Sequence, residues 1–376
     1  MTSPNALPAQ RCVHIGIVVR DARRSAAHYA RILGAHRWSV MDCDARRVTN
    51  AAVRGTATEQ SFRLAQSTVQ NTTGDITFHL IEPRGGWTTA HEFLYTRGEG
   101  IHHICTGVLT PDKFTELQPW LDRQGVGVLE DVTLDQACRY VTLNTQAQLG
   151  VRVQLLVTAD PARTLRADEV WDFSESAADD EPLLPVQNLR PHFGVVVGDV
   201  IACVEHWRRL LGIQRADFKH WSTGEPGSLR DTVNMGAPVD HAYFATILRP
   251  APDLGFELIQ PTRGPSHYKE QFLQRVGEGI HHVYLSRFET PQDCNLAIAR
   301  ANEYGCPVVM GGEVGDRLAR FYYIDTTQTL GFVSELTHPE AGYALHLLPT
   351  PTMSMVFDSD PQKKSEAPTA QKETNP

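Results

Sequence analysis

Several common patterns are missing from this chain of 376 residues, and each absence excludes a class of protein. The seven cysteines are odd in number, and no two form a C-x-x-C pair. We therefore expect free thiols in a reducing cytoplasm, with neither a zinc–cysteine site nor a disulfide framework. No apolar run approaches the ~20 residues that cross a bilayer. The first residues, MTSPNALPAQRC, also lack the basic-then-apolar pattern of a secretory signal.

Blocks of positive charge are also missing. Lys and Arg number 35 against 44 Asp and Glu, which gives a net charge of −9. An acidic chain without a basic run is a poor partner for nucleic acid or for an anionic membrane surface. Hydrophobic residues, by contrast, make up 41% of the chain and can form a sizeable core. Since domains typically contain ~100–200 residues, this length predicts two of them.

A long internal repeat is the most informative feature that is present. VHIGIVVRDARRSAAHYARILGA begins at Val13, and PHFGVVVGDVIACVEHWRRLLGI begins 178 residues later at Pro191. The hexapeptide GEGIHH occurs at Gly98–His103 and again at Gly277–His282. ITFHLIEPRGG parallels LGFELIQPTRG, and RYVTLNTQAQLG parallels RFYYIDTTQTLG, in the same order. Matched blocks at a nearly constant offset predict two related halves.

Each half also repeats within itself, as a strand, an amphipathic helix and three further strands. The sequence thus predicts an α+β protein of four βαβββ modules, paired into two tandem domains. The segment between the halves is acidic and rich in Pro, Ser and Ala, which is typical of a linker. The expected organisation is a flexible N-terminus (1–10), a first domain (11–158), an acidic linker (159–189), a second domain (190–349) and a disordered tail (350–376).

Four polar residues occupy apolar strands at equivalent points of the modules in the second half: His192, Glu257, His282 and Glu335. A polar side chain on the buried face of a strand must find a partner. Two imidazoles and two carboxylates suit one divalent ion such as Mn, Fe, Co, Ni or Zn. An ion that prefers six ligands would keep two positions for substrate oxygens and act as a Lewis acid. The alternatives are ordinary core histidines, and glutamates paired with Arg263 or Arg320.

The first half keeps the spacing of these positions but not their charge. The matching residues are His14, His79, His103 and Gln154. Because both carboxylates are missing, we expect a degenerate first domain whose residues shape the structure or the substrate, and a second metal is left open. In each His pair the second member matches the repeat, so His102 and His281 are expected on the opposite strand face.

The motifs around these residues resemble the vicinal oxygen chelate superfamily, which includes glyoxalase I, methylmalonyl-CoA epimerase and the extradiol dioxygenases. HIGIVV at His14, FELIQP at Glu257, GEGIHHV at His282 and LGFVSEL at Glu335 carry the resemblance. It covers about 11–156 and 190–339. It implies curved mixed sheets, two modules per domain, wrapped around a metal, with one divalent ion held by the four residues of the second half.

The resemblance also implies a chemistry. The protein would be a metal-dependent isomerase, epimerase or lyase, acting through a metal-chelated enolate of a carbonyl, hydroxyketone or acyl-CoA substrate. A base must then remove a proton next to the carbonyl. The candidates are the ligand carboxylates Glu257 and Glu335, and His220, His241 and Tyr243 on the middle strands. The expected partner is a small molecule, and a homodimer is left open.

Two other functions remain open from the sequence. An iron-dependent extradiol-type ring-cleaving dioxygenase also carries its metal in the second half, but it uses two histidines and one carboxylate. Thr326 stands where those enzymes usually have a proline. From a different class, some relatives only sequester a small molecule without turnover. A metal requirement, and loss of function in Glu257→Ala, would separate the enzymes from a pure binding protein.

Overall fold

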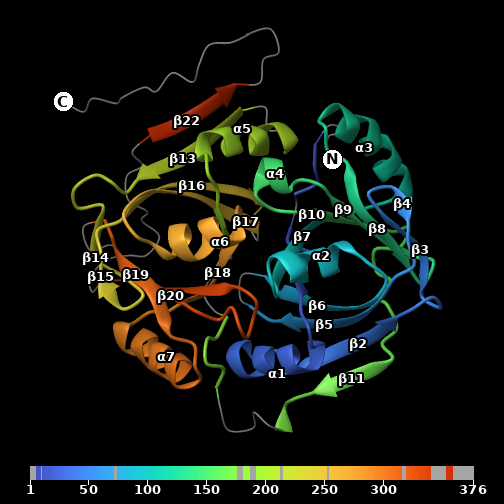
Figure 1. Cartoon of the computed structure of the whole chain (residues 1–376), viewed down its shortest axis with the longest axis horizontal. Helices are drawn as coiled ribbons and strands as arrows, with labels where there is room; N and C mark the ends of the chain where they lie inside the picture. The colour runs from blue at the N-terminus through green and yellow to red at the C-terminus, as the bar shows by residue number, and fades with distance from the viewer. Residues whose placement is uncertain are drawn as a thin grey trace.

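The computed structural model describes residues 6–9, 11–71, 74–175, 181–186, 192–211, 215–251, 254–315, 319–339 and 353–358; for 215–217 and 353–358 it describes the backbone alone. The chain forms two large mixed sheets with few helices, side by side in Figure 1. This confirms the predicted α+β class with curved mixed sheets. No helix in the described part of the chain is long and apolar enough to cross a membrane.

The first sheet has eleven strands in the order β11-β2-β5-β6-β1-β7-β10-β9-β8-β3-β4. Their bounds are β1 (His14–Val18), β2 (Arg37–Cys43), β3 (Val48–Val53), β4 (Thr56–Ala57), β5 (Ser61–Val69), β6 (Ile76–Gly85), β7 (Gly100–Leu109), β8 (Val128–Leu134), β9 (Cys138–Leu143), β10 (Val153–Val157) and β11 (Glu169–Asp172).

The second sheet also has eleven strands, in the order β15-β14-β19-β20-β21-β18-β12-β17-β16-β13-β22. Their bounds are β12 (His192–Val196), β13 (Arg215–Ser222), β14 (Leu229–Asn234), β15 (Ala237–Pro238), β16 (Ala242–Ala251), β17 (Leu254–Arg263), β18 (Gly279–Arg287), β19 (Val308–Val314), β20 (Ala319–Ile324), β21 (Val333–Pro339) and β22 (Met353–Asp358).

Both sheets have the same internal plan. The first strands of two modules pair antiparallel in the centre, as β1 with β7 and β12 with β18. Each of these also pairs in parallel with the last strand of its own module: β6, β10, β17 and β21 respectively. The β3–β4 hairpin extends from the first module to β8 of the second, and β14 reaches β19 in the same way. Each sheet therefore curls around a concave face, here called the first and second cup.

Helices follow the first strand of every module: α1 (Ala22–Leu33), α3 (Pro111–Arg123), α5 (Val200–Leu210) and α7 (Pro291–Glu303). Their starts follow local rules. Asp21 and Asp199 accept hydrogen bonds from free backbone N–H groups in the first turns of α1 and α5. Thr110 and Thr290 do the same for α3 and α7, and a proline follows each threonine at a position that needs no N–H.

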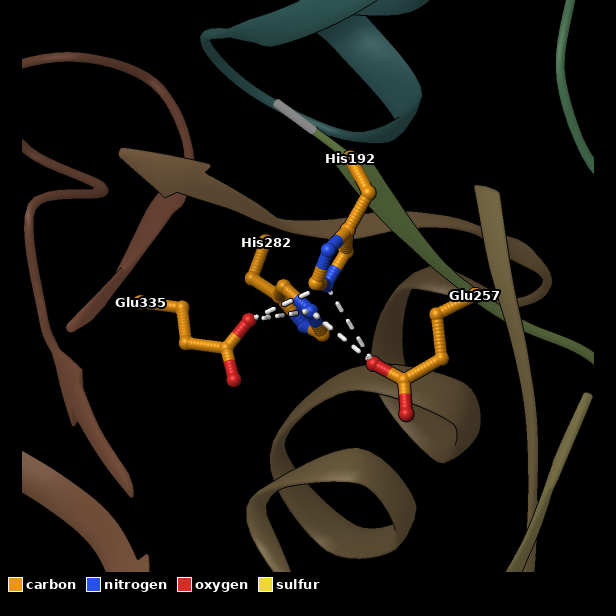
Figure 2. Close-up of side chains that lie close together, drawn as sticks. All are labelled: His192, Glu257, His282 and Glu335. Carbon is orange, nitrogen blue, oxygen red and sulfur yellow. Dashed lines mark ion pairs between the residues drawn. The ribbon is translucent and has the colours of Figure 1, made fainter. Parts of the chain in front are cut away.

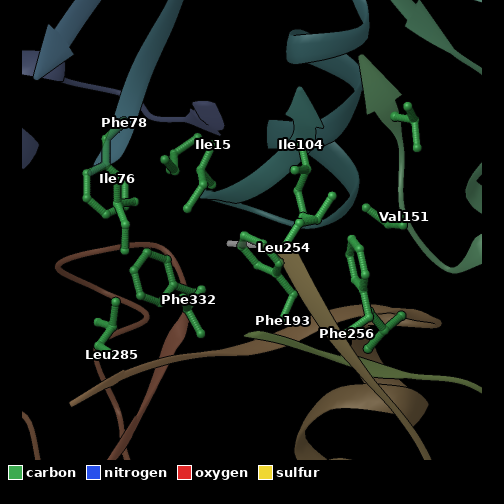
Figure 3. Close-up of a cluster of buried hydrophobic side chains, with 14 of the residues drawn as sticks. Ile15, Ile76, Phe78, Ile104, Val151, Phe193, Leu254, Phe256, Leu285 and Phe332 are labelled. Carbon is green, nitrogen blue, oxygen red and sulfur yellow. The ribbon is translucent and has the colours of Figure 1, made fainter. Parts of the chain in front are cut away.

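Side chains along the central strands point alternately to the two faces of each sheet, so one face lines a cup and the other packs into the core. On β1, Ile15 and Ile17 are buried in the main hydrophobic cluster, and the intervening residues face the first cup. On β12, Phe193 and Val195 do the same. Figure 3 shows that this cluster joins side chains of both halves, for example Ile76 and Phe78 of the first with Phe332 of the second. The two halves thus share one core, away from both cups.

The segments expected as a linker and a tail contain strands. In 159–189, β11 pairs antiparallel with β2, and Leu183 and Leu184 are buried. In 350–376, β22 pairs with β13 at the edge of the second sheet. The remaining parts of these segments, at 176–180, 187–189, 350–352 and 359–376, lie outside the described residues, as do 1–5 and 10. Four residues of the acidic segment, those of β11, thus belong to the first sheet.

Candidate metal centre

The second cup brings together the four residues that the repeat singled out (Figure 2). His192, Glu257, His282 and Glu335 come from the central strands β12, β17, β18 and β21. Glu335 Oε2 lies 3.2 Å from Nε2 of both histidines. Glu257 Oε2 lies 3.5 Å from His192 Nε2 and 3.6 Å from His282 Nε2. One ligand atom from each of the four lies within 4.8 Å of all the others.

This geometry fits a metal ion. Ligands about 2.1 Å from a shared ion are separated from one another by roughly 3–4 Å. His192 Nε2, His282 Nε2 and Glu335 Oε2 are buried and have no hydrogen-bond partner of good geometry. Buried polar atoms are seldom left in that state, and an ion between them would satisfy all three. Among the described residues, this is the one group of three or more His, Cys, Asp or Glu with ligand atoms so close together.

The charges of the quartet compensate one another. Burial alone would lower the pKa of His192, but the neighbouring Glu257 and Glu335 raise it to about 9. The pKa of His282 is raised by the same two carboxylates, again against the effect of burial. Burial would raise the pKa of Glu257, yet the two imidazoles lower it to about 2. In the metal-free protein the site is therefore a cluster of ion pairs, and a divalent cation can replace the protons on the imidazoles.

A glycine and a β-bulge aim His282 into the cup. Gly194 lies opposite His282, whereas the next residue, Val195, lies opposite Ile280. His281 is therefore the extra residue of a bulge, which re-aims the neighbouring side chains. The ring of His282 covers Gly194, where any Cβ would overlap the imidazole. The sequence signal was the glycine two residues after His192, and the repeat has it again as Gly16 beside His103.

The bulge also changes the expected role of His281. From the sequence, we expected it on the opposite strand face. It is buried, its Nδ1 lies 3.2 Å from His282 Nδ1, and its Nε2 lies 2.7 Å from His267 Nδ1. Burial and the two neighbouring imidazoles lower its pKa well below the usual value. A neutral His281 can fix the ring orientation of His282, as partners of metal-ligating histidines commonly do.

Two tyrosines support Glu335. Tyr268 Oη donates to Tyr323 Oη at 2.6 Å, and Tyr323 Oη lies 3.5 Å from Glu335 Oε1. Tyr268 and His267 belong to η2 (His267–Leu273), a π-helix that continues into α6 (Gln274–Val276). Neither residue was predicted from the sequence to belong to the site. The available signal was the offset between the halves, which grows by one residue between the pairs Gly86/Gly264 and Gly98/Gly277 on either side of η2. π-Helices commonly absorb one such insertion at functional sites.

His220 is placed away from the quartet, which corrects the expectation that it could act as a base. It lies opposite Thr246 on β16, and its Nδ1 is 2.8 Å from Thr246 Oγ1. Thr246 in turn lies opposite Leu258, the neighbour of Glu257 on β17. Because successive residues of a strand point to opposite faces, His220 lies on the helix-covered face of the sheet.

Tyr243 and His241 are on the side of the cup. Tyr243 lies opposite Pro261, on the same face of the sheet as Glu257. Its pKa is raised well above the usual value by burial, then by Glu257 and Glu335, so the phenol stays protonated and can donate. His241 stacks beside it with ring centroids 6.0 Å apart. It is 2% exposed, and both its ring nitrogens lack a partner.

The corresponding residues of the first cup form a different arrangement. His14 and His79 stack with their rings 3.7 Å apart, and His14 Nε2 lies 2.9 Å from Gln154 Oε1. Burial lowers the pKa of His14 to about 4 and that of His79 well below the usual value. The two halves differ as the sequence predicted. The first cup holds a neutral, hydrogen-bonded group, whereas the second holds a cluster of ion pairs.

Comparison with known proteins agrees with this fold. Residues 13–142 match the family model of the glyoxalase/bleomycin resistance protein/dioxygenase superfamily, which confirms the predicted resemblance for the first half. Over 90% of this chain, the structure is similar to 94% of a mutant 4-hydroxymandelate synthase from Streptomyces coelicolor, with 14% identity and a TM-score of 0.52. That likeness extends the fold to both halves.

Two further solved structures match more weakly. A Mn(II)-bound glyoxalase from Novosphingobium aromaticivorans matches over 90% of this chain and 85% of its own, with 14% identity and a TM-score of 0.43. A methylmalonyl-CoA epimerase variant from Streptomyces coelicolor, in complex with 2-nitronate-propionyl-CoA, matches over 40% and 99%, with 24% identity and a TM-score of 0.28. No curated protein sequence matches the chain.

Proposed function

We propose that this protein is a divalent-metal-dependent enzyme of the isomerase, epimerase or lyase kind, acting on a small carbonyl compound, a hydroxyketone or an acyl-CoA. One observation carries the proposal: two imidazoles and two carboxylates converge, buried, with three of their four facing atoms lacking a hydrogen-bond partner. A single Mn, Fe, Co, Ni or Zn ion held by His192, Glu257, His282 and Glu335 fits this donor set.

When bound, such an ion supplies Lewis-acid polarisation of a carbonyl group. Glu257 is the better placed of the two carboxylates to move a proton. Its Oε2 is farther from both imidazoles than that of Glu335, and its side chain is 15% exposed against 9%. Glu335 is also held by Tyr323. The proton on the carbon next to the carbonyl would pass to the Glu257 carboxylate and return to the same carbon or its neighbour.

The side of the cup offers groups that could orient a substrate. Tyr243 is a buried hydrogen-bond donor on the face of Glu257. His241 offers two ring nitrogens that have no partner. Burial lowers the pKa of His241, so its neutral imidazole can donate through one nitrogen and accept through the other. We assign both residues to substrate binding, and we leave His220 out because it lies on the other face of the sheet.

The metal claim is tested by metal analysis of the purified protein after loading with Mn, Fe, Co, Ni or Zn. We expect about one ion per chain. His192→Ala should lose it, because one of the four ligands is removed. The matched control is His14→Ala, the same position of the repeat in the first half, which should keep one ion. Near-zero occupancy of the native chain, or an ion that disappears in the control, would contradict the site.

The reaction is tested by proton exchange in D₂O. The metal-loaded protein should exchange the protons next to the carbonyl of hydroxyacetone, and NMR measures the loss of their signal. Glu257→Gln should keep the ion through its amide oxygen but slow the exchange by about 10²–10⁴-fold, the usual contribution of general base catalysis. Unchanged exchange in this variant would exclude Glu257 as the base, and no exchange with any carbonyl substrate would remove the isomerase proposal.

One observation favours a second candidate, an iron-dependent ring-cleaving dioxygenase. Glu335 is equidistant from both histidines at 3.2 Å, whereas Glu257 lies farther from each. Two histidines and one close carboxylate resemble the ligand set of non-haem iron oxygenases. Oxygen uptake by the Fe(II)-loaded protein with a catechol, without deuterium exchange on hydroxyketones, would favour this reaction over the first.

A further inference from the structure

The first cup encloses a hollow that the proposed function does not use. Its cavity volume is about 70 Å³, and it opens to solvent on one side. Half of its lining side chains are apolar, among them Val18, Phe62, Leu64, Ile81 and Val132. Small-molecule sites likewise combine apolar walls with a few polar groups. The hollow therefore has the lining of a site for a small ligand that stays partly exposed to solvent.

Small residues keep this cup open where large ones fill the other. Thr142 lies opposite Gln154, at the position where Tyr323 lies opposite Glu335 in the second cup. Ala90 is the second residue after the N-cap of α2 (Thr89–Thr96), and Tyr268 is the second residue after the N-cap of η2. The two tyrosines that support Glu335 thus have only small counterparts around the first cup.

The floor of this cup is not arranged for a cation. Gln154 Nε2 donates to Thr142 Oγ1 at 2.9 Å, so its Oε1 is left to accept from His14 Nε2. That nitrogen therefore carries a hydrogen and offers no lone pair to an ion. His79 stands at the position of Glu257, so no carboxylate balances a metal charge there. The lining contains one carboxyl group, Glu130, which is engaged by the hydroxyl of Thr89.

Three buried polar atoms in the lining lack hydrogen-bond partners. They are Gln60 Nε2, His102 Nε2 and His103 Nε2, and all three residues are buried and line the hollow. Gln60 occupies the repeat position of His241. Gln60 directly precedes β5 as His241 directly precedes β16. Gly86 lies against the backbone of Glu59 and Gln60, just as Gly264 lies against the backbone of Asp240 and His241. The amide of Gln60 is thus a donor aimed at something the protein itself does not supply.

We propose that the first cup is a second binding site, for a small uncharged molecule with an apolar body and one acceptor oxygen, which the amide of Gln60 receives. The apolar walls select the body, and the unpartnered donor selects the oxygen. A charged ligand is excluded because its lost hydration would meet no opposite charge at the neutral floor. This site stands independently of the proposed reaction in the second cup.

The experiment compares two probes of similar size, acetophenone and ethylbenzene, by ligand-observed NMR titration of the full-length metal-loaded protein. Only acetophenone carries an acceptor oxygen. We expect acetophenone to bind about fivefold to tenfold more tightly, the usual effect of one buried hydrogen bond. Gln60→Leu keeps the volume but removes the donor, so it should abolish the preference while ethylbenzene still binds.

Filling the cup provides the positional test. Leu64→Trp should abolish binding of both probes, and Val132→Phe, from another part of the wall, should weaken it as well. Leu64→Met, which conserves the volume, should keep the native affinity. One metal ion per chain in each variant reports that the second cup is intact. Saturable binding that survives in a folded Leu64→Trp variant, a preference that survives in Gln60→Leu, no binding of either probe, or two ions per native chain would each overturn the proposal.

Discussion

Gly194 illustrates how a single residue controls the candidate metal centre. It faces the second cup two residues after His192, and the imidazole of His282 lies directly over its Cα. Gly16 has the same relation to His103 in the first cup. A side chain at either position would displace a histidine ring, so the two glycines belong to the sites although they carry no chemistry themselves.

The repeat turns this observation into a controlled prediction. Gly194→Ala should destabilise the protein by about 1–3 kcal/mol through overpacking and should also sharply reduce metal occupancy, because His282 must move. Gly16→Ala creates the same overlap with His103 and should destabilise the protein comparably, but it should leave one ion per chain. Metal analysis and denaturant unfolding of both variants distinguish these effects. Equal metal loss in the two variants would show that destabilisation, and not the position of His282, controls binding.

The metal-free quartet also predicts a dependence of stability on pH. The pKa of His192 is raised from 6.5 to about 9 in the folded protein. Its contribution to the free energy of unfolding is therefore fully present below pH 6.5 and is lost as the pH rises toward 9. The pKa of Glu257 is lowered from 4.5 to about 2, so its contribution is present above pH 4.5 and is lost as the pH falls toward 2. The quartet stabilises the metal-free chain most between these limits.

We expect the free energy of unfolding of the metal-free protein to fall by about 3 kcal/mol at most between pH 6.5 and pH 9. Urea unfolding in the presence of a chelator measures it. His192→Gln should flatten this part of the profile. His14→Gln is the control, because the folded pKa of His14 is lowered to about 4 and its imidazole stays neutral throughout the range. A native profile that rises toward pH 9 would contradict the ion-pair cluster.

At the scale of elements, the strands of the two halves correspond while the connections differ. The helix α2 of the first half has one residue fewer before its GEGIHH strand than η2 has in the second. That extra residue accompanies the π-helix that carries His267 and Tyr268 to the second cup. The difference between an open cup and a filled one therefore arises in the connections and in a few strand positions, and not in the sheet topology.

The acidic segment between the halves gives an element-scale prediction. Trp171 on β11 is 2% exposed, and the guanidinium groups of Arg23 and Arg63 lie 5.3 and 5.7 Å from its ring. Trp171→Ala should lower the free energy of unfolding by about 3–5 kcal/mol, as for other buried aromatic residues. Val170→Ala, at the adjacent residue that is 48% exposed, should change it by about 0.5 kcal/mol or less. A negligible effect of both would show that the segment is only a tether.

At the scale of the whole molecule, the two halves share one hydrophobic cluster. Phe332 of the second half packs against Tyr29 of the first with ring centroids 6.4 Å apart. The hydroxyl of Tyr29 donates to the backbone oxygen of Leu330 at 2.6 Å. Arg97 Nη1 and Gln146 Nε2 both donate to the backbone oxygen of Glu278 at 2.9 Å. Contacts of this kind couple the folding of the halves.

We expect metal-free and metal-loaded protein each to show one calorimetric transition. The metal should raise the midpoint temperature of this transition because it binds only the folded state. Phe332→Ala should lower the midpoint temperature of that single transition, since loss of a buried phenylalanine typically lowers the free energy of unfolding by about 3–5 kcal/mol. Leu296→Ala, at an exposed site, is the control. Two resolved transitions, of which the metal shifts only one, would mean that the halves unfold independently despite their common core.

The sequence by itself determined the repeat, the α+β class and the candidate quartet. A strand exposes alternate residues to one face, so His192, Glu257, His282 and Glu335 were recognisable as out of place among apolar neighbours, and their recurrence aligned them. The same periodicity could not show that Glu169–Asp172 adds a strand, because a short acidic segment joins a sheet only through its partner. Nor could it show that His281 lies in a bulge or that His220 points away, because register is fixed by neighbouring strands. The roles of His267 and Tyr268, the small residues around the first cup and the unpartnered amide of Gln60 depend on residues far apart in the chain, so only the tertiary structure decided them.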